Sequence, residues 1–229
     1  MKRISVGVTE CSKYDNYAKW IALEENVEII RLSHKLNNLN DLEQCDALVL
    51  TGGEDIDPVL YHKPEYQKFI EEQDAKRDTF EWKALEHAQK KQLPLLGICR
   101  GLQIGNAFFG GTLIPDLITW GKEKHSKVKG YDLYHNATAV SNSLLFEITG
   151  SESGEVNSAH HQSADSLGQG LMINSMSPDQ VIEGLEWEDK KGKPFLLFVQ
   201  WHPERMKNQE SNFASGIRKA FISHTLQNR

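Results

Sequence analysis

The chain has 229 residues, of which 39% are hydrophobic and 25% charged, so it is long enough to bury a full core. Its formal net charge of −6 at pH 7 argues against nucleic acid or an anionic membrane as the main partner. No apolar run approaches the roughly twenty residues that cross a bilayer, and three cysteines without paired spacing suit a reducing compartment. We therefore expect a cytoplasmic protein with one domain over residues 1–229.

Strands and helices alternate along the first half of the chain. Its start is basic and then apolar, but too short in its apolar part for a signal peptide, so we expect it to supply the first strand. The hydrophobic pattern predicts strands and helices over these ranges: strands at 4–8, 27–32, 47–50 and 95–98, and helices at 13–25, 74–91 and 101–109. Such alternation is typical of an α/β fold with a doubly wound, mostly parallel sheet flanked by helices. Shorter β segments follow Gly111, among them 136–140, 181–187 and 195–201.

The third predicted strand ends in a Gly-Gly turn that three acidic residues follow. Gly52 and Gly53 form either a plain tight turn or a close approach of backbone amides to a substrate. Glu54, Asp55 and Asp57 invite a metal, but the segment lacks the ligand number and glycine register of a hard-metal loop. We expect a solvated acidic loop and no metal there.

The strongest chemical signal is a cysteine at the end of the fourth predicted strand. Gly97, Cys99 and Gly101 give the pattern Gly-x-Cys-x-Gly, a nucleophile elbow with sulfur in place of a hydroxyl. Such a turn holds the nucleophile in a strained conformation, and the amides of the following helix favour its thiolate. The alternative is a buried and inert cysteine.

The strand predicted at 195–201 ends in His202, Pro203 and Glu204. Residues i and i+2 of an extended segment face the same way, so Glu204 can orient His202 as the general base that a cysteine nucleophile needs. Two parallel strands end at the same rim of a sheet, where open α/β folds place their ligand sites. On its own, His202 could equally be a structural histidine that binds its neighbour.

These residues resemble the class I glutamine amidotransferase superfamily, and further motifs resemble its γ-glutamyl hydrolase branch, particularly the bacterial γ-glutamyl-γ-aminobutyrate hydrolase-like members. The resemblance runs from about residue 4 to residue 204. It implies a flavodoxin-like α/β fold. The motifs that carry it are Gly97–Gln103, Trp201–Glu204, Thr51–Pro58 followed by Tyr61, Arg77–Asp78, Gly110–Leu113 and Val156–Gln162.

The resemblance implies a catalytic triad of Cys99, His202 and Glu204, with no cofactor. It also implies an oxyanion hole made by the backbone amides of Gly53 and Arg100, each worth about 3 kcal/mol of barrier. The Arg100 side chain is a candidate counter-charge for a substrate carboxylate, or alternatively the partner of a structural acid.

The same resemblance places four polar side chains near a glutamyl group. Gln103 lies one helical turn past the cysteine and therefore on the same helix face. Ser158, His160 and His161 would border the pocket, or else satisfy their own loop. We expect no zinc at the two histidines, because adjacent strand residues face opposite ways and no third ligand has suitable spacing nearby.

The reaction expected from the resemblance is hydrolysis of a small γ-glutamyl amide through a γ-glutamyl thioester. A glutaminase subunit that supplies ammonia to a separate synthase, and a non-catalytic binding protein with the same fold, remain alternatives. A homodimer is left open. The chain departs from the family at Gln180, because Asp179–Gln180 stands where relatives commonly have Asp-Gly. If that turn needs a positive φ, Gln180 alters its shape.

Overall fold

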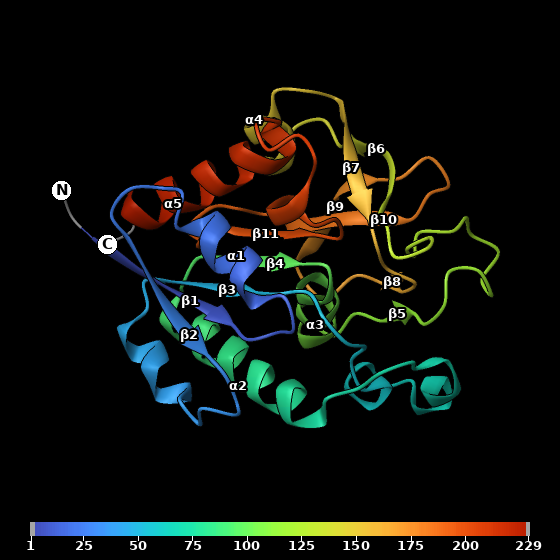
Figure 1. The fold of residues 1–229 in the computed structure, drawn as a ribbon, viewed down its shortest axis with the longest axis horizontal. Coiled ribbons are helices and arrows are strands. Elements are labelled where there is room, and N and C mark those ends of the chain that lie inside the picture. Colours follow the sequence, from blue (N-terminus) through green and yellow to red (C-terminus); the bar gives the residue numbers. More distant parts are fainter. Residues whose placement is uncertain (1–2, 228–229) are drawn as a thin grey trace.

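The computed structural model describes residues 3–227, and its centre is a nine-stranded mixed sheet (Figure 1). Five neighbouring strands run parallel and the remaining four continue the sheet antiparallel. In spatial order they are β2 (Val27–Leu32), β1 (Ile4–Thr9), β3 (Ala47–Leu50), β4 (Leu95–Ile98), β11 (Leu196–Val199), β10 (Ile182–Trp187), β9 (Leu171–Met176), β6 (Leu133–Ala139) and β7 (Ser153–Ser158). A two-stranded sheet pairs β5 (Leu113–Ile114) with β8 (Ser163–Ala164).

Helices cover both faces of the parallel part of the sheet (Figure 1). One face packs against α1 (Tyr14–Ile21) and α5 (Ile217–Gln227), with α4 (Leu144–Thr149) beside them. The other face packs against α2 (Ala75–Lys91) and α3 (Arg100–Phe108). Across residues 3–227, no helix combines the length and apolarity that a membrane span needs.

Alternate residues of the central strands pack into two separate hydrophobic cores, because successive strand side chains point to opposite faces. Val49 and Val199 face α1 and α5, whereas Leu48, Leu50 and Phe198 face α2 and α3. All five are fully buried. A nearly continuous apolar run is what a parallel strand covered on both faces requires.

The predicted fold class is confirmed, and two elements differ from their predicted bounds by three residues or more. The first helix is shorter than the predicted 13–25, ending at Ile21 before a turn at residues 22–24. The strand predicted at 136–140 begins earlier, at Leu133, because its pairing with β7 continues through polar residues.

The Asp179–Gln180 turn has the positive φ that a glycine at the second position would favour. Gln180 has φ 63°, a left-handed conformation that costs a non-glycine residue about 1–2 kcal/mol. The side chain is exposed, while its carbonyl accepts a bond from Lys122 Nζ. The turn therefore keeps its shape at an energetic cost.

We expect Gln180→Gly to raise the free energy of unfolding by about 1 kcal/mol, because relief of the strain exceeds the added entropy of the unfolded chain. Urea unfolding measures the change. Asn142→Gly is the matched control: Asn142 is also exposed, with φ 66°, but asparagine tolerates this conformation, so the gain should be smaller. A destabilised Gln180→Gly protein would contradict the strain argument.

Candidate active site

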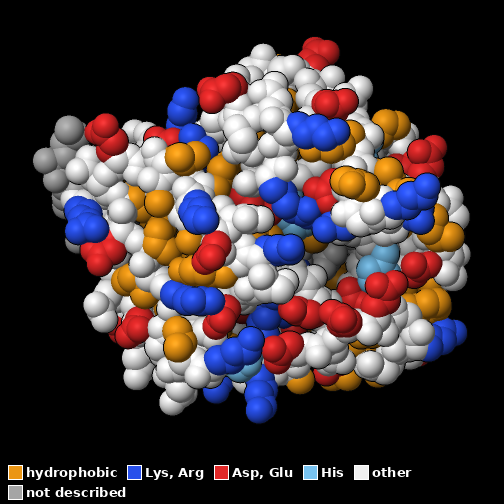
Figure 2. Space-filling view, in the orientation of Figure 1, with side chains coloured by type: hydrophobic (Ala, Val, Ile, Leu, Met, Phe, Trp, Pro, Cys, Tyr) orange, Lys and Arg blue, Asp and Glu red, His pale blue; other side chains and the backbone are white. Residues whose placement is uncertain are grey.

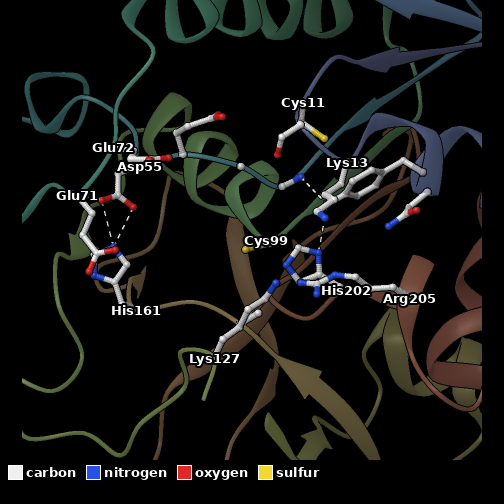
Figure 3. Close-up of a pocket in the computed structure, with 17 residues that line it drawn as sticks. Cys11, Lys13, Asp55, Glu71, Glu72, Cys99, Lys127, His161, His202 and Arg205 are labelled. Carbon is white, nitrogen blue, oxygen red and sulfur yellow. Dashed lines mark hydrogen bonds and ion pairs between the residues drawn. The ribbon is translucent and has the colours of Figure 1, made fainter. Parts of the chain in front are cut away.

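The ends of three parallel strands meet at one rim of the sheet. Gly52 follows the end of β3, Cys99 comes directly after β4, and His202 lies just past β11. The β3–β4 and β4–β11 pairs are both parallel, so all three chains leave the sheet on the same side. Figure 3 shows Cys99 and His202 side by side at the cavity.

Cys99 sits in a strained turn between β4 and α3. Its φ is 54° and its ψ is −104°, a conformation that L-residues rarely adopt. The sharp turn needs glycines on either side: a Cβ at Gly101 would lie 2.3 Å from the Leu50 carbonyl oxygen, and one at Gly97 would lie 2.7 Å from the Gly101 carbonyl oxygen. The residue is 7% exposed, and Gln200 Nε2 donates to its Sγ at 3.5 Å.

His202 is held by two side chains on the ring nitrogen that faces away from Cys99. Its Nδ1 lies 3.0 Å from Glu204 Oε1 and 3.2 Å from the Tyr17 hydroxyl. The Asn157 side chain accepts the His202 backbone N–H at 3.0 Å. Burial alone would lower the pKa of His202, but the charges of Glu204 and Cys99, with hydrogen bonds to both, raise it to about 9.

The Gly52–Gly53 turn lies against both reactive side chains. A Cβ at Gly52 would stand 2.8 Å from His202 Cε1 and 3.5 Å from Cys99 Cβ, so only glycine fits. The Gly52 N–H donates to Tyr17 Oη at 3.1 Å. Within residues 3–227, the N–H groups of Gly53 and Arg100 have no hydrogen-bond acceptor. Both are thus available for a substrate oxygen, and their role as an oxyanion hole stays a prediction.

A buried ion-pair network fixes the backbone of this turn. Arg77 pairs with Glu81 Oε1 at 3.0 Å and donates to the carbonyls of Thr51 and Gly52 at 3.2 and 3.0 Å. Arg100, 1% exposed, pairs with Asp78 and with Glu81. Of the two alternatives for the Arg100 side chain, the structure therefore places it with structural acids.

A cavity of about 660 Å³ opens over Cys99, and its walls carry opposite charges. Figure 2 shows the hollow with acidic side chains gathered along one edge and basic ones on the other. The acidic wall comprises Glu54, Asp55, Glu71 and Glu72, and the basic wall comprises Lys13, Lys127 and Arg205. In Figure 3 Cys99 lies between these two groups.

The four side chains expected near a glutamyl group take different positions. His161 lines the cavity, and its Nε2 lies 3.0 Å from Asp55 Oδ1. Gln103 is buried and donates to the Gln162 carbonyl at 3.2 Å, while Ser158 and His160 are buried behind the cavity wall. Their direct contact with a substrate stays a prediction, and His161 has the most accessible position of the four.

Sequence reasoning missed several groups that the fold brings to the site. Tyr17, which binds both His202 and Gly52, lies in a helix whose pattern marks it only as an apolar core position. Lys13 and Arg205 line the cavity from segments far apart in the chain. No local pattern distinguishes such residues, because their role arises from tertiary contacts alone.

Comparisons with known proteins agree with this fold. The model of the peptidase C26 family matches residues 23–204. Protein NtpR of Enterococcus hirae is 36% identical over 175 residues, covering 74% of this chain and 71% of that protein. The γ-glutamyl-γ-aminobutyrate hydrolase PuuD of Escherichia coli is 29% identical over 188 residues, covering 76% and 72%. A glutamine amidotransferase structure from Thermotoga maritima superposes with TM-score 0.63 at 16% identity, covering 100% of this chain and 86% of that one.

Proposed function

The chain belongs to the peptidase C26 family, a family of hydrolases, and on this premise we propose that it cleaves the γ-glutamyl amide bond of a small γ-glutamyl compound, releasing glutamate and an amine. The observation that carries the proposal is the strained Cys99 next to His202 and Glu204 on the floor of a charged cavity. The likeness to a γ-glutamyl-γ-aminobutyrate hydrolase supports the bond type.

In the proposed mechanism, Cys99 is the nucleophile and His202 moves the protons. His202 takes the thiol proton, and the sulfur attacks the δ-carbonyl carbon, forming a C–S bond and an oxyanion. The N–H groups of Gly53 and Arg100 stabilise the oxyanion, each contributing about 3 kcal/mol. The C–N bond then breaks as His202 gives its proton to the leaving amine.

The second half of the reaction hydrolyses the thioester. His202, again neutral, accepts a proton from water, whose oxygen attacks the acyl carbon. The C–S bond breaks, the sulfur regains the proton, and glutamate leaves. Glu204 keeps the imidazole oriented throughout and stabilises its charged form.

The opposite charges of the cavity walls suit the zwitterionic end of a γ-glutamyl group. Lys13 and Lys127 offer cations to the α-carboxylate, and Glu54 and Glu71 offer anions to the α-ammonium. Placed between these walls, the γ-amide would lie over Cys99. The cavity volume of about 660 Å³ leaves room for a leaving group larger than ammonia.

A glutamate-release assay with the purified chain tests the proposal. The substrates are γ-glutamyl-γ-aminobutyrate, a poly-γ-glutamyl compound and glutamine, with an α-glutamyl dipeptide as the matched control. We expect kcat/KM for one γ-glutamyl compound to exceed that for glutamine by at least about 10-fold, about 1.4 kcal/mol of transition-state binding. Turnover of glutamine alone, dependent on an added partner, would instead favour the ammonia-supplying subunit. No turnover of any γ-glutamyl bond would favour a binding protein.

The pKa of His202 predicts the alkaline limit of activity. The ring must be protonated to release the amine, so kcat/KM should fall as pH rises through about 9. Glu204→Gln removes the largest charge that raises this pKa. The pH at which kcat/KM falls should therefore move roughly one to three units lower. A pH profile measures both. Glu210→Gln, which changes an exposed acid, is the control. If Glu204→Gln loses activity at the same alkaline pH as the wild type, the pairing of Glu204 with His202 is contradicted.

A further inference from the structure

A second cluster of polar side chains lies behind the cavity wall, outside the machinery described so far. It brings together His125 from the segment between β5 and β6, His135 from β6, His160 from the segment after β7, and Glu183 from β10. Glu183 is 0% exposed, and His125 and His160 are almost fully buried. The segments are distant in sequence, so only the fold creates this cluster.

Four of the atoms that face one another in the cluster lack hydrogen-bond partners within residues 3–227. Within the described residues, neither carboxylate oxygen of Glu183 accepts a hydrogen bond, and the Nε2 atoms of His135 and His160 neither donate nor accept one. Buried polar atoms in this number are costly unless something satisfies them, and a buried charge costs the most. The cluster as it stands is therefore incomplete.

A bond to the far side of the His160 ring shows which of its nitrogens carries a lone pair into the centre. His160 Nδ1 lies 2.9 Å from the Gln162 carbonyl oxygen, which can only accept, so Nδ1 holds the proton and Nε2 is the free base. His125 Nε2 lies 3.2 Å from Asp179 Oδ1, so Nε2 holds a proton, and His125 Nδ1 lies 3.4 Å from both Ser158 Oγ and Glu183 Oε1. The lone pair of His160 Nε2 thus faces the Glu183 carboxylate, an arrangement that is repulsive unless a cation lies between them.

The distances from Glu183 to the three rings suit ligands that share one ion. Glu183 Oε1 lies 3.1 Å from His135 Nε2, 3.4 Å from His125 Nδ1 and 3.7 Å from His160 Nε2. Zinc bonds of about 2.0–2.1 Å in a tetrahedron separate neighbouring ligand atoms by about 3.3 Å. The ligand atoms of His125, His135 and Glu183 all lie within 4.8 Å of one another. His160 Nε2 stands outside this trio, 3.7 Å from Glu183 Oε1, and would move inward to complete the shell.

We propose that His125, His135, His160 and Glu183 bind one zinc ion as a structural site. Three imidazoles and one carboxylate are ligands that zinc prefers, and all four positions are filled by the protein, as in sites that stabilise a fold. The bonds from His125 to Asp179 and from His160 to the Gln162 carbonyl are the outer contacts that typically orient zinc-bound histidines. This proposal replaces the sequence expectation of no metal, which considered only ligands near His160 in the chain.

The zinc ion would hold the long segment between β5 and β6 against the sheet. His125 belongs to the segment 115–132, which joins β5 to β6 and carries Lys127 at the cavity. Glu183 is also linked to the candidate active site. Its backbone carbonyl accepts the Gln200 N–H, and the Gln200 side chain donates to Cys99 Sγ. Metal loss should therefore lower stability first and loosen the basic cavity wall second.

Metal analysis of the full chain, purified without a histidine tag from zinc-supplemented cells, tests the proposal. We expect about one zinc per chain after gel filtration, a melting temperature at least about 5 °C lower after chelation, and recovery with Zn²⁺ but not Mg²⁺. Glu183→Gln and His135→Gln should lose the zinc, and the exposed His62→Asn should retain it. If wild-type protein equilibrated with Zn²⁺ holds less than about 0.1 equivalent and its melting temperature does not move, the proposal is wrong.

Cys99→Ala separates this proposal from the proposed function. Cys99 and His202 could themselves capture zinc, so the variant should keep about one equivalent, with X-ray absorption showing nitrogen and oxygen ligands and no sulfur. Loss of zinc in Cys99→Ala, or sulfur ligation in the wild type, would overturn the site. Neither readout depends on turnover, and both remain decisive if the Glu183 and His135 variants do not fold.

Discussion

Replacing Cys99 by alanine is expected to abolish hydrolysis of the γ-glutamyl bond while leaving the fold intact. Without the sulfur no thioester can form, and removal of a nucleophile from such a triad typically costs about 10³–10⁶-fold in kcat. Stability should change little, because a methyl group replaces a side chain held in a strained turn. Steady-state glutamate release measures the activity, and circular dichroism verifies folding.

Cys45→Ala is the matched control for this experiment. Cys45 is buried as deeply as Cys99, but burial raises the pKa of its thiol to about 12, so it stays protonated and unreactive. The control should keep nearly full activity. Retained turnover in a folded Cys99→Ala protein would show that Cys99 is not the nucleophile.

Glu81→Gln is expected to cause the largest loss of stability among the substitutions considered. Glu81 is completely buried and pairs with both Arg77 and Arg100, so its removal leaves two buried guanidinium groups with too few anions. Breaking a buried ion pair on one side costs about 3–5 kcal/mol. Equilibrium unfolding in guanidinium chloride, analysed for a shifted midpoint at constant slope, gives the value.

Activity should fall together with stability in this variant. Arg77 holds the carbonyls of Thr51 and Gly52, so a displaced guanidinium would move the turn that presents the Gly53 amide. Glu86→Gln, an exposed change on the same helix, should stay within about 0.5 kcal/mol of the wild type. A loss of unfolding free energy below about 1 kcal/mol in Glu81→Gln would show that the ion-pair network does not anchor the turn.

The sequence predicted the parallel half of the sheet well because its central strands are short, apolar and separated by helices. Residues 47–50 and 95–98 show the pattern typical of a strand covered on both faces, and both strands have the predicted bounds. From there the shared rim of Cys99 and His202 follows from parallel pairing alone. The left-handed conformation of Gln180 was foreseeable too, since relatives commonly have glycine there.

The antiparallel half and the second cluster were much harder to predict. β6 and β7 carry asparagine, serine, threonine and glutamate at both exposed and buried positions, so hydrophobic alternation marks them poorly. His125 and Glu183 are 58 residues apart, and their contact depends on how β10 passes beside the segment after β5. Spacing rules detect local ligand sets only, which is why the sequence expectation considered His160 and His161 by themselves.

The most direct test of the central claim is rapid-quench mass spectrometry of the protein during turnover of a γ-glutamyl substrate. We expect a transient mass increase of one γ-glutamyl acyl group, located by peptide mapping on Cys99 and absent from Cys99→Ala. Acylation of any other residue, or turnover at every quench time without an acylated enzyme, would contradict it.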